Sequence, residues 1–283
     1  MIDPQVPKNS SSIMSVNMVK EVQSRAVAIR ESILKMSFEA STPHIGSSLS
    51  CVDILAACYT LFGAEYLCDD SIFLLSKGHG APALYATLRE FDVLDDHDLQ
   101  GFGKAGSVLE EHPNHLIRGV VHPSGSLGHG LGFAAGFVLA GRALGANKRA
   151  TVVLSDGECN EGTVWEAALF AGGKGLCGLT AIVDRNGLQA TGSTSESYGQ
   201  IDIADSFESF GWSTTTIDGH NSAQILSALS DARLNNDGPV CIIADTVKGK
   251  GVSFMENDNN WHYRKLDAET LEMAQVALAD SSK

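Results

Sequence analysis

Short apolar segments and longer segments of helical periodicity alternate along almost the whole chain, and this alternation constrains the fold more than any other feature. The apolar segments predict strands at residues 71–75, 149–154, 179–183, 213–217 and 240–245. Apolar residues at helical spacing predict helices at residues 16–40, 50–62, 127–144, 163–171, 203–210, 222–234 and 267–279, with a further helix starting near residue 81. Strands that alternate with helices favour the α/β class, with a parallel sheet that has helices on both faces.

One large domain is the simplest organisation for the 283 residues. The sequence has no internal repeat, low-complexity tract or clear linker, so we expect the domain to occupy residues 15–283. Residues 1–14 are polar and predict a flexible N-terminal tail. Segment 127–144 is rich in small residues, and we expect a buried helix that packs closely against its neighbours.

The composition argues against several partners and surroundings. The net charge of −14 would repel a phosphate backbone, so nucleic acid is not an expected partner. The chain has no run of 18 apolar residues, and its N-terminus has no apolar core of signal-peptide length, so no membrane contact or secretion is expected. The six cysteines form no CxxC pair and are typical of reduced thiols, which favours a cytoplasmic protein.

Clusters of polar residues and glycines follow the predicted strands. They occupy residues 77–80, 155–162, 184–187 and 246–251. Open parallel sheets bind ligands beyond the carboxyl ends of their strands. We therefore expect these clusters to converge on one crevice.

Asp156 and Asn186 follow two neighbouring strands and supply a carboxylate and an amide oxygen. With a backbone carbonyl they make hard oxygen ligands of the kind that Mg²⁺ prefers, and Gly157 lets the backbone approach a phosphate. A structural turn at Asp156 is the alternative. An EF-hand loop is not supported, because Glu161 and Ala167 stand where that loop needs glycine and glutamate. The sequence also lacks a P-loop, and no GxGxxG follows a predicted strand.

The span from Asp156 to Asn186 resembles the thiamine diphosphate signature, in which DG is followed about thirty residues later by asparagine. Ser155 stands where that family usually has glycine. Segments 40–49 (ASTPHIGSSL), 76–80 (SKGHG), 125–130 (GSLGHG) and 261–262 (WH) resemble the N-terminal part of transketolases. The resemblance runs from about residue 16 to residue 279. It implies the thiamine-diphosphate-binding fold (PP domain) and the free-standing N-terminal subunit of a split transketolase.

The resemblance implies a cofactor and metal set. Asp156, Asn186 and the Leu188 carbonyl would bind Mg²⁺, for which Ca²⁺ or Mn²⁺ could substitute. The residues assigned to thiamine diphosphate are His79 and Gly157 at the diphosphate, Gly125 and Leu127 at the aminopyrimidine, and Glu158, Asn186, Lys248 and His262. For Lys248 an ordinary surface lysine is the alternative.

The resemblance also implies catalytic histidines. His44 and His112 would surround the hydroxyls of the donor, and His262 would lie between the diphosphate and the substrate. Imidazole titrates near working pH and suits proton transfer from a hydroxyl. Glu161 would serve communication between subunits, with an exposed glutamate at a helix start as the alternative. His129 stands where the family usually has glutamine, and its role stays open.

The activity implied is transfer of a two-carbon ketol unit from a ketose or ketose phosphate to an aldose, with the cofactor storing the carbanion. The pyrimidine domain and its catalytic glutamate are expected on a separate C-terminal subunit, in an α2β2 assembly. The alternatives are an acyloin or deoxyxylulose-phosphate enzyme, a specialised secondary-metabolite transketolase, or a catalytically silent regulatory module. His44, His112 and His262 favour a hydroxylated donor.

Overall fold

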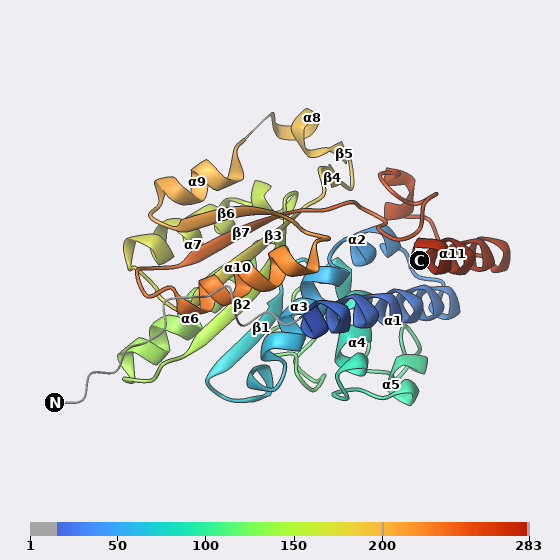
Figure 1. Cartoon of the computed structure of the whole chain (residues 1–283), viewed down its shortest axis with the longest axis horizontal. Helices are drawn as coiled ribbons and strands as arrows, with labels where there is room; N and C mark the ends of the chain where they lie inside the picture. Colours follow the sequence, from blue (N-terminus) through green and yellow to red (C-terminus); the bar gives the residue numbers. More distant parts are fainter. Residues whose placement is uncertain (1–15, 200, 282–283) are drawn as a thin grey trace.

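A five-stranded parallel sheet forms the centre of the molecule (Figure 1). In this computed structural model residues 16–199 and 201–281 are described, so the predicted N-terminal tail lies outside the described residues. The strands are β1 (Ser71–Leu75), β2 (Arg149–Ser155), β3 (Leu179–Arg185), β6 (Ser213–Asp218) and β7 (Val240–Asp245), in the spatial order β1-β2-β3-β7-β6. All four pairings are parallel, which confirms the predicted α/β class.

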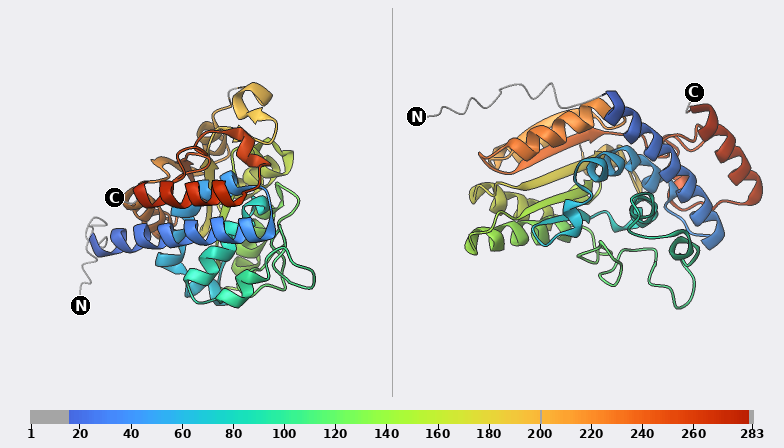
Figure 2. Two further views of the ribbon diagram at one scale, coloured as in Figure 1. Left: turned by 90° about the vertical axis from the view of Figure 1, so that its right-hand side faces the viewer. Right: turned by 60° about the horizontal axis from the view of Figure 1, so that its bottom comes forward.

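Helices cover both faces of the sheet (Figure 2). One core contains residues of α1 (Val16–Ala40), α3 (Val52–Phe62), α4 (Ala81–Glu90), α10 (Ser222–Leu234) and α11 (Ala268–Ser281). The other contains residues of α6 (His129–Ala143), α7 (Gly162–Gly173) and α9 (Ile203–Ser209). In β1, Phe73 and Leu75 belong to the first core while Ile72 and Leu74 belong to the second. The continuous apolar runs are therefore explained by burial on both faces.

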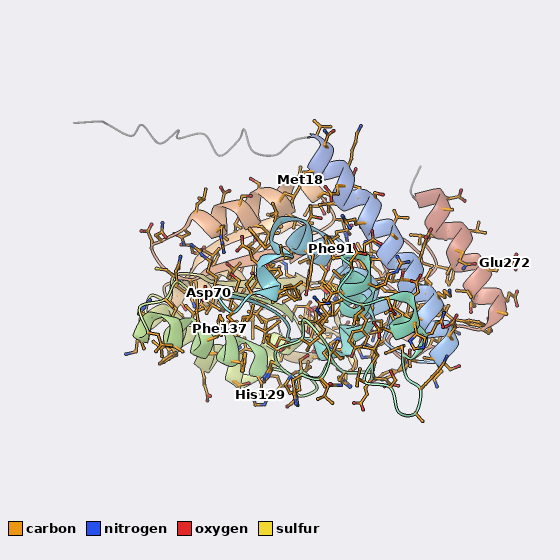
Figure 3. The ribbon with its side chains drawn as sticks, turned by 90° about the horizontal axis from the view of Figure 1, so that it is seen from below. Met18, Asp70, Phe91, His129, Phe137 and Glu272 are labelled. Atoms are coloured by element: carbon orange, nitrogen blue, oxygen red, sulfur yellow. The ribbon has the colours of Figure 1, made fainter. Side chains whose placement is uncertain are left out.

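Helix α6 differs from the prediction. It begins at His129, and its outer side is exposed at Gly132, Phe133 and Gly136, so the expectation of a fully buried helix was wrong. Figure 3 labels His129 and Phe137 along this helix. The small residues occur around the helix, and those that are buried share their side with Leu131 and Val138.

Several short elements carry too few residues to show a period in the sequence. They are α2 (Ile45–Ser50), α5 (Asp96–Gln100), α8 (Thr194–Tyr198) and the antiparallel pair β4 (Leu188–Gln189) and β5 (Gly192–Ser193). Three 3₁₀ turns, Gly78–Gly80, Glu158–Asn160 and Asn259–His262, carry candidate site residues. Within the described part of the chain, every helix is too short or too polar to cross a lipid bilayer.

Candidate active site

A cavity of about 400 Å³ opens at the carboxyl ends of β1, β2 and β3. Most of the residues singled out from the sequence line it: His44, His79, His112, Gly125, Leu127, Gly157, Glu158, Glu161, Asn186, Leu188 and His262. The volume falls within the range of small-molecule sites. The expectation that the strand-end clusters share one crevice therefore holds for three of the four clusters; the fourth, 246–251, lies behind the cavity wall.

The chain brings its histidines to this cavity from separate elements. His79 lies on the turn after β1, His44 directly precedes α2, and His262 ends the turn Asn259–His262. The His44 ring centroid is 4.9 Å from that of His262 and 5.7 Å from that of His79. His112 lies against Gly125, where an added Cβ would be 3.8 Å from the His112 ring. Of the named histidines, three thus form a compact cluster and the fourth lines the same wall.

His44 has two unusual local features. Its Nδ1 is buried and finds no hydrogen-bond partner among residues 16–199 and 201–281, although buried polar atoms in folded proteins are almost always paired. Its backbone has φ 68°, in the left-handed region that residues other than glycine rarely adopt. The chain holds this conformation with a hydrogen bond of 3.0 Å from the His44 N–H to the His262 carbonyl.

The clustered histidines are neutral at physiological pH. Burial lowers the pKa of His44, and burial together with the Lys77 ammonium holds the pKa of His79 well below its usual range. Burial and then the Lys248 ammonium lower the pKa of His262 to about 3. These rings therefore each offer one N–H donor and one acceptor nitrogen.

Asp156 and Asn186 lie on the loops after β2 and β3. The Asp156 carboxylate accepts hydrogen bonds from the N–H groups of Gly157 (2.9 Å) and Gly187 (2.7 Å). The Asn186 side-chain oxygen accepts from the Leu188 N–H at 3.1 Å. Burial and the neighbouring Asp184 carboxylate raise the pKa of Asp156 to about 6. A buried carboxylate beside another carboxylate is the electrostatic setting that a cation relieves, so the residues fit Mg²⁺.

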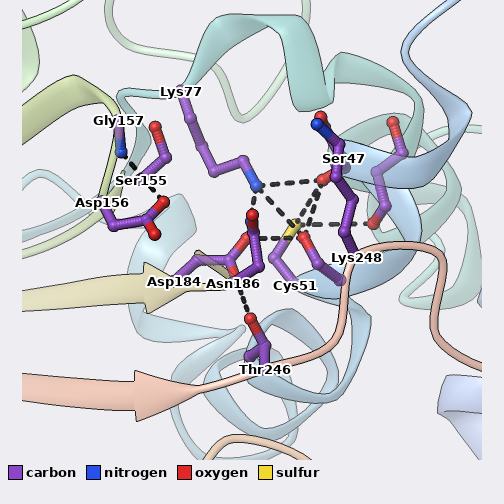
Figure 4. A network of polar contacts seen from close by, with 12 residues as sticks. Ser47, Cys51, Lys77, Ser155, Asp156, Gly157, Asp184, Asn186, Thr246 and Lys248 are labelled. Carbon is purple, nitrogen blue, oxygen red and sulfur yellow. Dashed lines mark hydrogen bonds and ion pairs between the residues drawn. The ribbon is translucent and has the colours of Figure 1, made fainter. Parts of the chain in front are cut away.

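Beneath this edge lies a buried ion pair that sequence reasoning missed (Figure 4). Lys77 and Asp184 have fully buried side chains and form a salt bridge. Asp184 also accepts hydrogen bonds from the hydroxyls of Ser50 and Thr246, and Lys77 donates to the Ser47 carbonyl at 2.9 Å. Burial alone would raise the pKa of Asp184, but Lys77 and these hydrogen bonds hold it below its usual value. No pattern in 76–80 reveals that the Lys77 side chain turns inward.

The Glu158 side chain is fully buried and bonded within the protein. Its carboxylate accepts from the Ser76 hydroxyl, the Gly128 N–H and the Ser155 N–H. It therefore ties together the loops after β1 and β2 and the start of α6. Its predicted contact with the cofactor stays a prediction.

Two predicted residues lie off the main cavity. Asp156 lines an adjoining hollow of about 290 Å³ together with Asn160 and Gly187. Lys248 lies behind the cavity wall, where its Nζ contacts Asn259 Oδ1 at 2.8 Å and His262 Nδ1 at 2.9 Å. Lys248 is buried, so it is not the ordinary surface lysine that was the alternative. Residues missed from the sequence that line the cavity are Ser47, Ser155, Asn160, Gln189, Ala190 and Thr191.

Two other features compete weakly for function. A hollow of about 530 Å³ is lined by Glu31, Lys35 and Arg89, and none of the strand-end side chains reaches it. In the described ranges, the only His, Cys, Asp and Glu side chains grouped closely enough to hold a metal are Asp95, His97 and Asp98, all exposed. Asp95 and Asp98 form a capping box at the start of α5, which accounts for their arrangement.

The parallel sheet, the histidine cluster and the oxygen-bearing side chains at the strand ends lie around one cavity. Residues 23–281 match the family described as the thiamine diphosphate binding domain of transketolase, and the chain belongs to this family.

Two relatives in this family are single subunits of transketolases. The chain is 33% identical to one subunit of the apulose-4-phosphate transketolase of Phocaeicola vulgatus, over 87% of this chain and 89% of the relative. It is 35% identical to the 6-deoxy-6-sulfo-D-fructose transketolase subunit SqwG of a Clostridium species, over 93% of this chain and 97% of the relative. These names confirm the resemblance to N-terminal subunits of split transketolases.

Solved transketolases share the fold. The structure from Campylobacter jejuni superposes with a TM-score of 0.82 at 25% identity, and that from Leishmania mexicana with 0.78 at 23%. The chain spans 43% and 45% of those proteins, less than half of each. This confirms the predicted thiamine-diphosphate-binding fold.

Proposed function

We propose that the chain is the cofactor- and magnesium-binding subunit of a two-chain transketolase that moves a two-carbon ketol unit from a ketose to an aldose. The observation that carries the proposal is the convergence of His44, His79 and His262 on the cavity that Gly157 and Asn186 also line. When bound, thiamine diphosphate supplies the electron sink for cleaving the carbon–carbon bond.

The residues of this chain would bind the two ends of the cofactor. His79 and the Gly157 backbone serve the diphosphate, and Gly125 and Leu127 serve the aminopyrimidine. An added Cβ at Gly157 would lie 3.0 Å from the Gln189 Cβ, so only glycine leaves this wall undisturbed. Mg²⁺ would be held by Asp156, Asn186 and the Leu188 carbonyl. The ion would balance the charges of the diphosphate and of the Asp156 carboxylate, whose pKa is raised.

Three histidines would bind the sugar and transfer its proton. His44 and His112 form hydrogen bonds with the hydroxyls of the ketose. Neutral His44 then takes up a proton from one hydroxyl as the carbon–carbon bond of the ketose breaks. His262 stands between the diphosphate and the sugar.

A second subunit would complete the site. The proposal assigns to it the pyrimidine domain and the catalytic glutamate, within an α2β2 assembly. Exposed Glu161 lies at the start of α7, and the two neighbouring helices also expose Phe133 on α6 and Leu169 and Phe170 on α7. Apolar side chains exposed beside a site are typical of a surface that a protein partner covers. Cytoplasmic placement is part of the proposal and is supported by six free cysteines.

Co-purification with a C-terminal transketolase subunit tests the proposal. We expect the chain alone to bind thiamine diphosphate weakly in a Mg²⁺-dependent way, measured by calorimetry, and to show no turnover. The reconstituted pair should transfer ketol units from ketose donors to aldose acceptors. Ketol transfer by the single chain at enzyme-like rates would contradict the partner requirement. A pair that binds no cofactor would contradict the function.

A further inference from the structure

We propose that Lys248 is a positioning residue, whose ammonium group holds the His262 ring in the neutral form that carries its hydrogen on Nε2. His262 would then present an N–H donor to the cavity. The catalytic consequence rests on the proposed function, whereas the form of the ring is a property of this chain alone.

The hydrogen bonds around Lys248 determine the form of the ring. Lys248 Nζ lies 2.9 Å from His262 Nδ1 and 2.8 Å from Asn259 Oδ1. An ammonium group has donors only, so His262 Nδ1 must accept. A neutral imidazole that accepts at Nδ1 carries its hydrogen on Nε2. Because Nδ1 is used by Lys248, Nε2 is the nitrogen that remains for the cavity lined by His262.

The backbone on each side of Lys248 is fixed. The Val247 N–H donates to His220 Nε2 at 2.8 Å, and His220 Nδ1 lies 2.7 Å from an oxygen of Asp53. The Lys248 carbonyl accepts from the Asn257 N–H at 2.9 Å, and the Gly249 N–H donates to the Gly46 carbonyl at 3.0 Å. The Lys248 side chain therefore extends to His262 from a rigid loop, as a positioning role requires.

The charges around the pair agree with this assignment. The groups that face His262 or Lys248 from neighbouring elements are His44, His79, Tyr263, Lys77, Asp156 and Asp184. Burial and then Lys77 lower the pKa of Lys248 to about 8, so most Lys248 side chains are charged at pH 7. The pKa of His262 is about 3, so that ring is neutral under the same conditions. A charged donor thus faces a neutral acceptor.

NMR of the ¹⁵N-histidine-labelled full chain at pH 7 tests the form of the ring directly, with His262→Asn assigning the signals. We expect a bare Nδ1 and a protonated Nε2 in the wild type, and a His262 that stays neutral down to pH 5. Lys248→Met should raise the pKa of His262 by about one unit or more and mix the two ring forms. Lys250→Met is the matched control, since it removes a partly exposed lysine two residues away and should leave the signals unchanged.

A wild-type ring protonated on Nδ1 overturns the proposal without any substitution, so a variant that fails to fold does not matter. An unchanged His262 pKa in a folded Lys248→Met chain overturns it as well.

Kinetics with the partner subunit separate positioning from direct cofactor contact. If Lys248 acts through His262, the double variant Lys248→Met/His262→Ala loses no more kcat than His262→Ala alone. Lys248→Met should also weaken thiamine diphosphate binding no more than His262→Ala does. Additive losses would show that Lys248 contacts the cofactor or substrate itself, and would overturn the proposal. A pair with the expected NMR signals but no ketol transfer would refute only the proposed function.

Discussion

Asp184 and Asp156 lie at the carboxyl ends of two adjacent strands, β3 and β2, yet their carboxylates meet opposite surroundings. Asp184 is bonded to Lys77, Ser50 and Thr246, and its pKa is held below the usual value. Among the described residues, Asp156 receives hydrogen bonds from backbone N–H groups alone, and its pKa is raised to about 6. The comparison separates a group whose charge the protein itself balances from one whose charge a ligand must balance.

Breaking the buried ion pair between Lys77 and Asp184 should have the largest effect on stability. Asp184→Asn leaves Lys77 charged and buried without its counter-ion, so the free energy of unfolding should fall by about 3–5 kcal/mol. Chemical denaturation with and without Mg²⁺ measures it. The exposed pair Arg89 and Asp96 is the control, and Asp96→Asn should cost less than about 1 kcal/mol. Equal losses in the two variants would show that the buried pair is not special.

The Asp156 carboxylate should make the free energy of unfolding of the metal-free chain depend on pH. The pKa of Asp156 is higher in the folded than in the unfolded chain. The free energy of unfolding that Asp156 contributes therefore falls as pH rises from about 4 to about 6. A change from 3.8 to about 6 corresponds to a loss of up to about 3 kcal/mol at pH 7. Asp156→Asn should remove this pH-dependent loss. Chemical denaturation of the wild type and the variant at pH 4 and pH 7 would measure the difference in the free energy of unfolding. A pH-independent difference between the chains would refute the assignment.

Thr246→Val should lower stability less than Asp184→Asn does. It removes one hydrogen bond to the Asp184 carboxylate while Lys77 and Ser50 remain. We expect the free energy of unfolding to fall by about 1.5 kcal/mol. Thermal and chemical unfolding check this, and Thr216→Val on the exposed edge of β6 should change the free energy little. No loss in Thr246→Val would mean that water replaces the hydroxyl.

His44→Ala should have the smallest effect on stability and a large one on activity. The Nδ1 of His44 has no partner in the described part of the chain, so its removal leaves no group unpaired and costs only the packing of the ring, about 1 kcal/mol or less in the free energy of unfolding. With the partner subunit, kcat should fall about 100-fold. His115→Ala, which removes an exposed histidine of the same loop region as His112, is the control for both assays. Full activity in His44→Ala would remove His44 from the proposed site.

The sequence predicted the strands of the main sheet because they depend on local patterns, whereas most of the cavity residues were predicted through the resemblance to transketolases. Segment 71–75 begins and ends where predicted, since five consecutive buried residues leave no ambiguity of face. Gly157, Asn186 and His79 converge because the parallel strands that precede them end at one edge, whereas His44 and His262 reach the cavity from other elements. The inward course of Lys77 could not be predicted, because its partner Asp184 is 107 residues away. The position of Lys248 behind His262 likewise depends on how the loop after β7 folds back.

Glu158 has a consequence for how this protein can change over generations. Its carboxylate binds the Ser76 hydroxyl and the Gly128 N–H, and the Ser76 hydroxyl in turn accepts from the Gly130 N–H. An added Cβ at Gly130 would collide with that hydroxyl. A mutation at any one of these positions leaves the others mismatched. We therefore expect positions 76, 128, 130 and 158 to be inherited as one block, substituted together or not at all.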